Sequence, residues 1–205
     1  MKPGKLKVTF LEKTVLVEKV APAIIFLALW LNGSVYPLLL LPFLYVIFVE
    51  KRGIRFLGFQ KNGASKSLYL GTMVSVFLMI THYFVFRHYF PLIGRLTPNL
   101  YDIFTDVFWY PLYEEIAYRS FFLNHFADLN PPSVHRKNLV INLAQSTFFV
   151  SIHKHHVASG VPLVLVVVFL LAFLNGFVFN KTKNISGCLL SHCAVNAFGL
   201  TLRYV

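Results

Sequence analysis

The chain has 205 residues, of which 57% are hydrophobic and 13% are charged, and its mean hydropathy is +0.64. A soluble domain averages about 45–50% apolar and about 25% charged residues, so this composition excludes an ordinary soluble domain. The net charge of +11 does not indicate nucleic-acid binding, because the lysines and arginines lie between apolar runs, where membrane topology places them. We therefore expect an all-α, polytopic transmembrane helix bundle that forms one integral-membrane domain over residues 1–205.

The first half of the chain predicts a surface segment and three spans. Residues 1–16 interleave lysine with apolar side chains, as is typical of a basic amphipathic segment at the membrane surface. Residues 17–49 are almost wholly apolar, too long for one span and barely enough for two, and an Asn-Gly-Ser break interrupts them. We predict two short helices in a hairpin there, then a polar basic loop over 50–66 and a span over 67–86.

The second half predicts four further spans, over residues 101–126, 138–152, 161–179 and 185–202. The total is about seven, and six to eight are compatible with the pattern. An N-terminus in the cytoplasm places most lysines and arginines on the cytoplasmic side, in agreement with the positive-inside rule.

The span over 101–126 carries two adjacent carboxylates and a guanidinium among aromatic and aliphatic side chains. A charged side chain at bilayer depth costs at least ~2.5–3.5 kcal/mol, so it is rarely present without a function. Glu115 and Arg119 are one helical turn apart and can form an ion pair, whereas Glu114 points about 100° away. This spacing predicts that Glu115 is neutralised within its own helix and that Glu114 remains available as a buried general base.

Two more polar groups lie on later spans, each with four-residue spacing: Phe149 with His153, and His192 with Asn196. Each group alone has a structural interpretation, since membrane histidines and asparagines often make packing hydrogen bonds between helices. Together, a free carboxylate, two imidazoles and an amide supply a base, acids or metal ligands, and an oxyanion donor. Those groups are the minimum for hydrolysing an amide bond.

In this order the three motifs resemble the CPBP intramembrane proteases, which comprise CAAX prenyl proteases of type II and bacteriocin-processing or self-immunity proteins. The signature of that family is EExxxR, then FxxxH, then HxxxN on successive helices, and this chain contains all three. The likeness covers about residues 105–200, within a catalytic core expected over 101–202.

The resemblance implies a role for each motif residue. Glu114 would activate an attacking water that His153 helps to hold or deprotonate. His192 and Asn196 would stabilise the tetrahedral oxyanion. The supporting residues would be Glu115, Arg119 and Phe149. Nearby hydroxyl and thiol groups are expected to pack rather than act as nucleophiles, namely Ser120, Ser191 and Cys193.

Metal dependence stays open at the level of the sequence. Glu114, His153 and His192 could bind a divalent metal such as Zn²⁺ with water as the fourth ligand. Alternatively, a carboxylate and an imidazole in a low-dielectric pocket activate water without a metal. The chain has no HExxH motif, and each candidate ligand comes from a different helix, so we favour a site without a cofactor.

We expect an intramembrane endopeptidase whose partner is a membrane-associated protein or peptide substrate: a lipidated C-terminus, a sorting tail or a leader peptide. It would reside in the lipid bilayer of a prokaryotic plasma membrane, with its N-terminus in the cytoplasm, and would bind no nucleic acid. The alternative is a non-catalytic bacteriocin self-immunity or scaffold membrane protein of the same family. One feature fits the hydrolytic interpretation poorly, since His153 and His192 are expected to differ in depth by roughly 10 Å.

Overall fold

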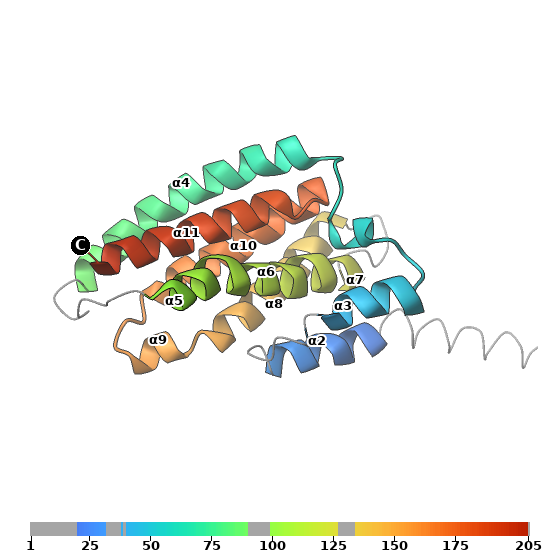
Figure 1. Cartoon of the computed structure of the whole chain (residues 1–205), viewed down its shortest axis with the longest axis horizontal. Helices are drawn as coiled ribbons and strands as arrows, with labels where there is room; N and C mark the ends of the chain where they lie inside the picture. Colours follow the sequence, from blue (N-terminus) through green and yellow to red (C-terminus); the bar gives the residue numbers. More distant parts are fainter. Residues whose placement is uncertain (1–19, 32–37, 39, 90–98, 127–133, 205) are drawn as a thin grey trace, which may run out of the picture.

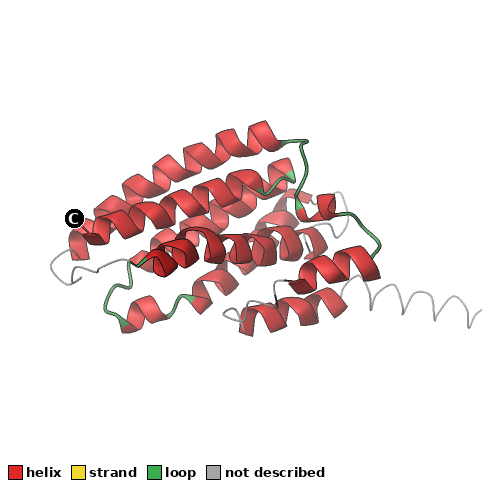
Figure 2. Ribbon diagram, viewed as in Figure 1, coloured by secondary structure: helices red, strands yellow, loops and turns green. Residues whose placement is uncertain are grey.

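The computed structural model describes residues 20–31, 38, 40–89, 99–126 and 134–204, and most of them are helical (Figures 1 and 2). No strand occurs in these ranges, which confirms the expected all-α class. The basic segment expected over 1–16 and the break between the first two predicted spans lie outside the described residues.

Helices occupy all seven stretches that the sequence predicts as spans. In chain order they are α2 (Ala21–Leu31), α3 (Leu40–Leu44) continued by η3 (Tyr45–Val49), α4 (Ala64–Tyr89), a composite helix over 100–126, α8 (Val134–Ile152), α10 (Val164–Thr182) and α11 (Ser186–Tyr204). The short helices η4 (Ile54–Leu57) and α9 (His155–Ala158) lie between them. In the part of the chain that the structure describes, two helices, Ala64–His88 and Val164–Thr182, are long and apolar enough to cross a membrane. The bundle therefore contains two candidate spans, and the number seven stays a prediction.

The composite helix, which we call the glutamate helix, runs without a break from Leu100 to Phe126. It consists of α5 (Leu100–Phe104), η5 (Thr105–Trp109), α6 (Tyr110–Glu114), η6 (Glu115–Leu123) and α7 (Asn124–Phe126). Both η5 and η6 are π-helical, a wider turn that is rare and frequently found at functional sites. The helix lies between α2 on one side and α11 on the other (Figure 1).

Helices α4 and α11 pack with their backbones in contact. A Cβ atom at Gly71 would overlap the carbonyl oxygen of Gly187, so neither position has room for a side chain. The buried Ser67 hydroxyl donates to the carbonyl of Asn184 (2.9 Å) and accepts from the Gly187 N–H (3.0 Å). These contacts fix the first turn of α11, five residues before His192.

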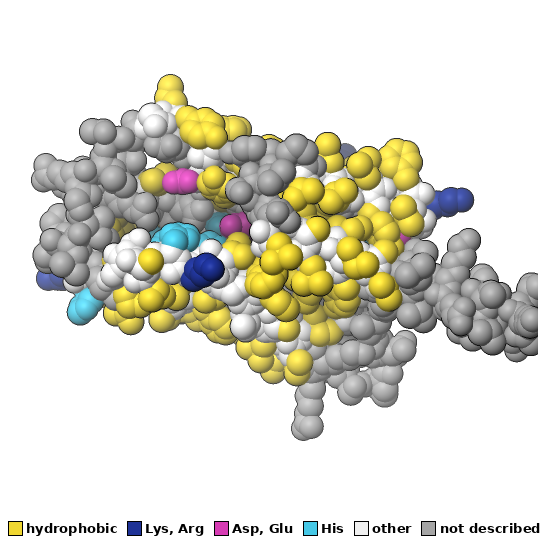
Figure 3. Space-filling view, turned by 90° about the horizontal axis from the view of Figure 1, so that it is seen from below, with side chains coloured by type: hydrophobic (Ala, Val, Ile, Leu, Met, Phe, Trp, Pro, Cys, Tyr) yellow, Lys and Arg dark blue, Asp and Glu magenta, His cyan; other side chains and the backbone are white. Residues whose placement is uncertain are grey.

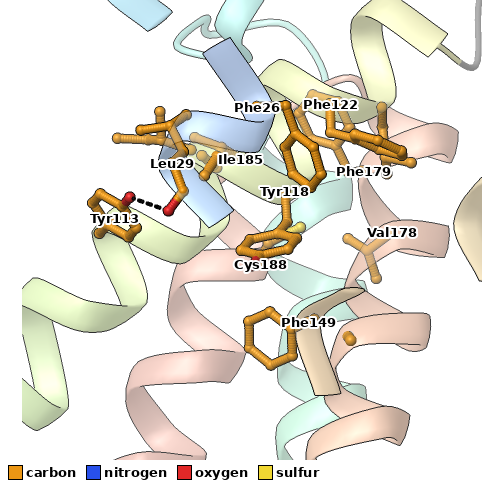
Figure 4. Packing of buried hydrophobic residues seen from close by; sticks show 14 of the residues in the cluster. Phe26, Leu29, Tyr113, Tyr118, Phe122, Phe149, Val178, Phe179, Ile185 and Cys188 are labelled. Atoms are coloured by element: carbon orange, nitrogen blue, oxygen red, sulfur yellow. Dashed lines mark hydrogen bonds between the residues drawn. The ribbon is translucent and has the colours of Figure 1, made fainter. Parts of the chain in front are cut away.

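The main apolar core lies where α2, the glutamate helix, α8, α10 and α11 meet (Figure 4). Its centre is aromatic: the Tyr118 ring makes edge-to-face contacts with Phe26 (5.4 Å between centroids) and Phe149 (5.2 Å). The Tyr113 hydroxyl donates to the carbonyl of Leu29 (3.0 Å), so α2 is hydrogen-bonded to the glutamate helix one residue before Glu114.

Apolar side chains also cover much of the outer surface. On α4 the exposed ones are Leu68, Tyr69, Met73, Val76, Phe77, Ile80, Tyr83 and Phe84. On the face seen in Figure 3, most of the side chains of described residues are likewise hydrophobic. Monomeric soluble proteins rarely expose so many neighbouring apolar side chains. Such patches are typical of surfaces in contact with lipid or with a partner protein.

Candidate active site

Glu114 is the last residue of α6, directly before the π-helical segment η6, and its carboxylate meets imidazoles from two other elements. Its Oε1 lies 3.8 Å from Nε2 of His153, and its Oε2 lies 3.5 Å from Nε2 of His192. His153 follows the last residue of α8, and His192 lies in the second turn of α11. Three elements that are distant in sequence therefore bring these groups within 4 Å of one carboxylate.

Both imidazoles are oriented by their other ring nitrogen. Nδ1 of His153 is 2.8 Å from the carbonyl oxygen of Phe149, and Nδ1 of His192 is 2.8 Å from Oε1 of Glu115. A carbonyl and a carboxylate can only accept, so each Nδ1 carries a hydrogen and donates it. In each ring, Nε2 is the nitrogen that faces Glu114.

The difference in depth that the sequence predicts between the two histidines does not keep them apart. Helix α8 contacts α10 through the Asn142 amide, which donates to the carbonyl of Phe173. Two turns later it contacts the glutamate helix, where Phe149 packs on Tyr118. Whatever the path of α8 between these neighbours, the 3.8 Å between Nε2 of His153 and Oε1 of Glu114 places the two groups at the same level.

Glu115 and Arg119 form the expected ion pair, with 3.2 Å between Oε2 and Nε, and neither side chain is exposed. The guanidinium also stacks on Phe149, with its carbon 4.5 Å from the ring centroid. Glu115 has more partners than the sequence predicts, because its Oε1 accepts from both His192 (2.8 Å) and Asn175 (3.1 Å). The two glutamates therefore hold opposite nitrogens of the His192 ring.

A cavity of about 800 Å³ opens beside these groups, and Glu114, His153, His192 and Asn196 all line it. Figure 3 shows a hollow in the otherwise apolar surface, with acidic and histidine side chains visible inside it. Nδ2 of Asn196 donates one hydrogen to the carbonyl of Asp106 (2.7 Å), which anchors the amide to the glutamate helix. Apolar residues form another part of the cavity wall: Val161, Val164, Val167, Val168, Leu171, Val195 and Leu200.

Sequence reasoning missed Asn175, which lies on α10 and is fully buried. It is the only polar side chain between Val164 and Phe179, so the argument that singled out Glu114 could also have found it. The Ser191 hydroxyl donates to Oδ1 of Asn175, and the Cys188 thiol donates to the backbone carbonyl of Asn175 (3.3 Å). Ser191 and Cys188 are thus engaged in helix packing.

The donor types at the site are those that zinc prefers, a carboxylate and two imidazoles whose Nδ1 hydrogens are held by oxygen acceptors. Among the residues with described placement, no three His, Cys, Asp or Glu side chains are grouped closely enough to hold a metal ion, and metal dependence stays a prediction.

Comparison with known proteins supplies one match. The family model described as type II CAAX prenyl endopeptidase, Rce1-like, matches residues 95–198. That range holds the glutamate helix, all of α8 and α10, and α11 as far as Phe198, two residues after Asn196. No curated protein and no solved structure matches the chain.

Proposed function

Because this chain belongs to the family of Rce1-like type II CAAX prenyl endopeptidases, we propose that it is an intramembrane endopeptidase whose nucleophile is a water activated by Glu114. Membership makes it a hydrolase of an integral-membrane protease family that acts on membrane-associated proteins. The observation that carries the proposal is the meeting of Glu114, His153 and His192 at the wall of one cavity.

The proposed nucleophile lies between Glu114 and His153. Oε1 of the carboxylate and Nε2 of the imidazole are both acceptors, so one water can donate a hydrogen to each. Its oxygen lone pairs then face the cavity and the scissile carbonyl. As the water oxygen bonds to the carbonyl carbon, Glu114 takes the proton, and general-base catalysis of this kind contributes about 10²–10⁴-fold.

In this proposal His192 is a hydrogen-bond donor to the oxyanion and does not activate the water. Its Nδ1 hydrogen is held by Glu115, so a second hydrogen on Nε2 makes the ring a cation between two carboxylates. The buried charges then balance, two negative on the glutamates and two positive on Arg119 and His192, as buried charges require.

The tetrahedral oxyanion is stabilised by hydrogen bonds from His192 and Asn196. Nδ2 of Asn196 has two hydrogens and gives one to the carbonyl of Asp106, which leaves the second for the oxyanion. When the carbon–nitrogen bond breaks, the proton held by Glu114 passes to the departing amine. The other proton of the water stays on the new carboxyl group, so the products are a carboxylic acid and an amine, and no covalent enzyme intermediate forms.

We propose a lipidated C-terminus as the substrate, with a prenylated cysteine. The family acts on CAAX prenyl substrates, and the apolar part of the cavity wall suits a hydrocarbon chain beside the polar groups. A sorting tail or a leader peptide offers no such chain to those valines and leucines.

A comparison of protein termini in membranes tests this function. Cells that carry the wild-type chain are expected to contain new C-termini that are absent with Glu114→Ala, because cleavage requires the carboxylate. The measurement is mass spectrometry of terminal peptides, with equal amounts of both proteins in the membrane as the control. Identical termini in the two samples would contradict a peptidase and agree with a non-catalytic immunity or scaffold protein.

Chelation is expected to leave the activity unchanged, because the proposed chemistry uses only side chains and water. Purified protein would be treated with a chelator, its metal content measured, and cleavage of a prenylated peptide followed before and after. Activity that disappears with the metal and returns with added Zn²⁺ would overturn the metal-free mechanism.

A further inference from the structure

Asn175 joins α10 to the two elements that carry Glu115 and His192. Its Nδ2 donates to Oε1 of Glu115 and to the carbonyl of Cys188, both at 3.1 Å, and its Oδ1 accepts from the Ser191 hydroxyl. Both amide hydrogens and the amide oxygen are therefore used. The reverse orientation would turn the amide oxygen toward a carboxylate and a carbonyl, so the partners determine which atom is nitrogen.

The Asn175 amide contacts one oxygen of the Glu115 carboxylate, Oε1. Oε1 accepts from Asn175 and from Nδ1 of His192, whereas Oε2 pairs with Arg119. The carboxylate is thus held at both ends, by a cation in its own helix and by an amide from α10. Without the amide, only His192 itself would keep Oε1 in position.

We propose that Asn175 is a positioning residue of the peptidase site. Its amide holds Oε1 of Glu115 at the place where that oxygen accepts the Nδ1 hydrogen of His192. The His192 ring is thereby kept with Nε2 toward Glu114. Asn175 is fully buried and does not line the cavity, so it acts through Glu115 and not on the substrate.

This inference rests on the proposed function and predicts a defect in turnover with little change in substrate affinity. In Asn175→Asp an oxygen replaces the nitrogen that faces Glu115, while the acceptor for Ser191 remains. We expect kcat to fall by about 10–100-fold, as for other groups that orient a catalytic histidine or ligand. KM should change by no more than about twofold, because uniform substrate binding is not affected.

Acid should partly restore Asn175→Asp. A protonated carboxyl group can donate to Oε1 of Glu115 as the amide did, so the ratio of variant to wild-type kcat is expected to rise as the pH falls. Asn175→Leu, which has no donor at any pH, should lose kcat without this recovery. A residue that only packs helices together would not produce an acid recovery in one variant and none in the other.

The experiment uses the full chain in proteoliposomes and an internally quenched fluorescent peptide that ends in a farnesylated Cys-aliphatic-aliphatic-X sequence. The matched control is Asn142→Asp on α8, another buried amide, which donates to the carbonyl of Phe173 (2.9 Å). It should keep the wild-type kcat and pH profile. If Asn175→Asp does not fold, Ser191→Ala removes the hydrogen bond that orients the amide and should lower kcat by about 2–10-fold.

Wild-type kcat in a folded Asn175→Asp or Ser191→Ala variant would overturn the positioning role, and so would a loss confined to KM. The role would also be overturned if Asn142→Asp lost as much kcat as Asn175→Asp and if Asn175→Asp did not recover at low pH. These outcomes leave wild-type cleavage intact and concern Asn175 alone. A folded wild-type protein without Glu114-dependent cleavage would instead contradict the proposed function.

Discussion

Replacement of Glu114 by glutamine is expected to abolish peptide cleavage while the protein remains folded. The amide has the size of the carboxylate but cannot accept the proton of the attacking water. The amide would also give His192, whose Nε2 lies 3.5 Å from the carboxylate, a neutral neighbour in place of a negative one. The rate should fall by about 10²–10⁴-fold or more, the contribution of a general base together with loss of the held water.

The measurement is cleavage of the farnesylated quenched peptide by matched amounts of reconstituted protein. Glu50→Gln is the control, because Glu50 is also a buried carboxylate, paired with His125 at 3.1 Å, and does not line the cavity. We expect that control to retain wild-type cleavage. A Glu114→Gln protein that cleaves at a rate close to that of the control would show that another group activates the water.

Arg119→Met should cause the largest loss of stability of any single substitution near the site. Arg119 and Glu115 are both fully buried, so removal of the guanidinium leaves the two buried glutamates with one positive charge fewer to balance them. Breaking a buried pair in this way costs about 3–5 kcal/mol. For a chain of this size that corresponds to a fall of roughly 6–20 °C in Tm, measured by thermal unfolding in detergent.

The double variant Glu115→Gln with Arg119→Met separates charge from packing. It removes both charges of the Glu115–Arg119 pair, so most of the lost stability should return, whereas cleavage should stay low because His192 loses the carboxylate that accepts its Nδ1 hydrogen. Arg52→Met is the control for a pair whose cation is exposed: Arg52 is 45% exposed and 3.9 Å from Glu50, and His125 still contacts that carboxylate, so the change should be under ~1 kcal/mol. Equal Tm values for the single and double variants would contradict the buried-charge argument.

The sequence predicts relations within one helix well. Helical spacing alone places Glu115 beside Arg119, and the apolar runs locate the helix over 101–126 to within one residue of its observed start at Leu100. The three motifs also indicate the family, which the matching family model now shows. These inferences succeed because they need only the helical period and the cost of charge in an apolar environment.

Relations between helices could not be derived in the same way. The contact of His192 with Glu115 depends on how α11 packs on the glutamate helix, and the contact of His153 with Glu114 depends on how α8 packs on it. The π-helical turns of η6 contain no proline or glycine, so the sequence gives no local signal that predicts them. The number of spans also depends on segment lengths that hydropathy alone does not determine, as α2 and α3 with η3 are short.

The central claim is that the cavity beside Glu114 is where a peptide bond is hydrolysed. Its most direct test is mass spectrometry of the products when purified wild-type protein in proteoliposomes is given the farnesylated peptide. We predict one new carboxylate, on the farnesylated cysteine, and a released tripeptide, with neither formed by the Glu114→Gln protein. An intact peptide after prolonged incubation with folded wild-type protein, or the same products from both proteins, would contradict it.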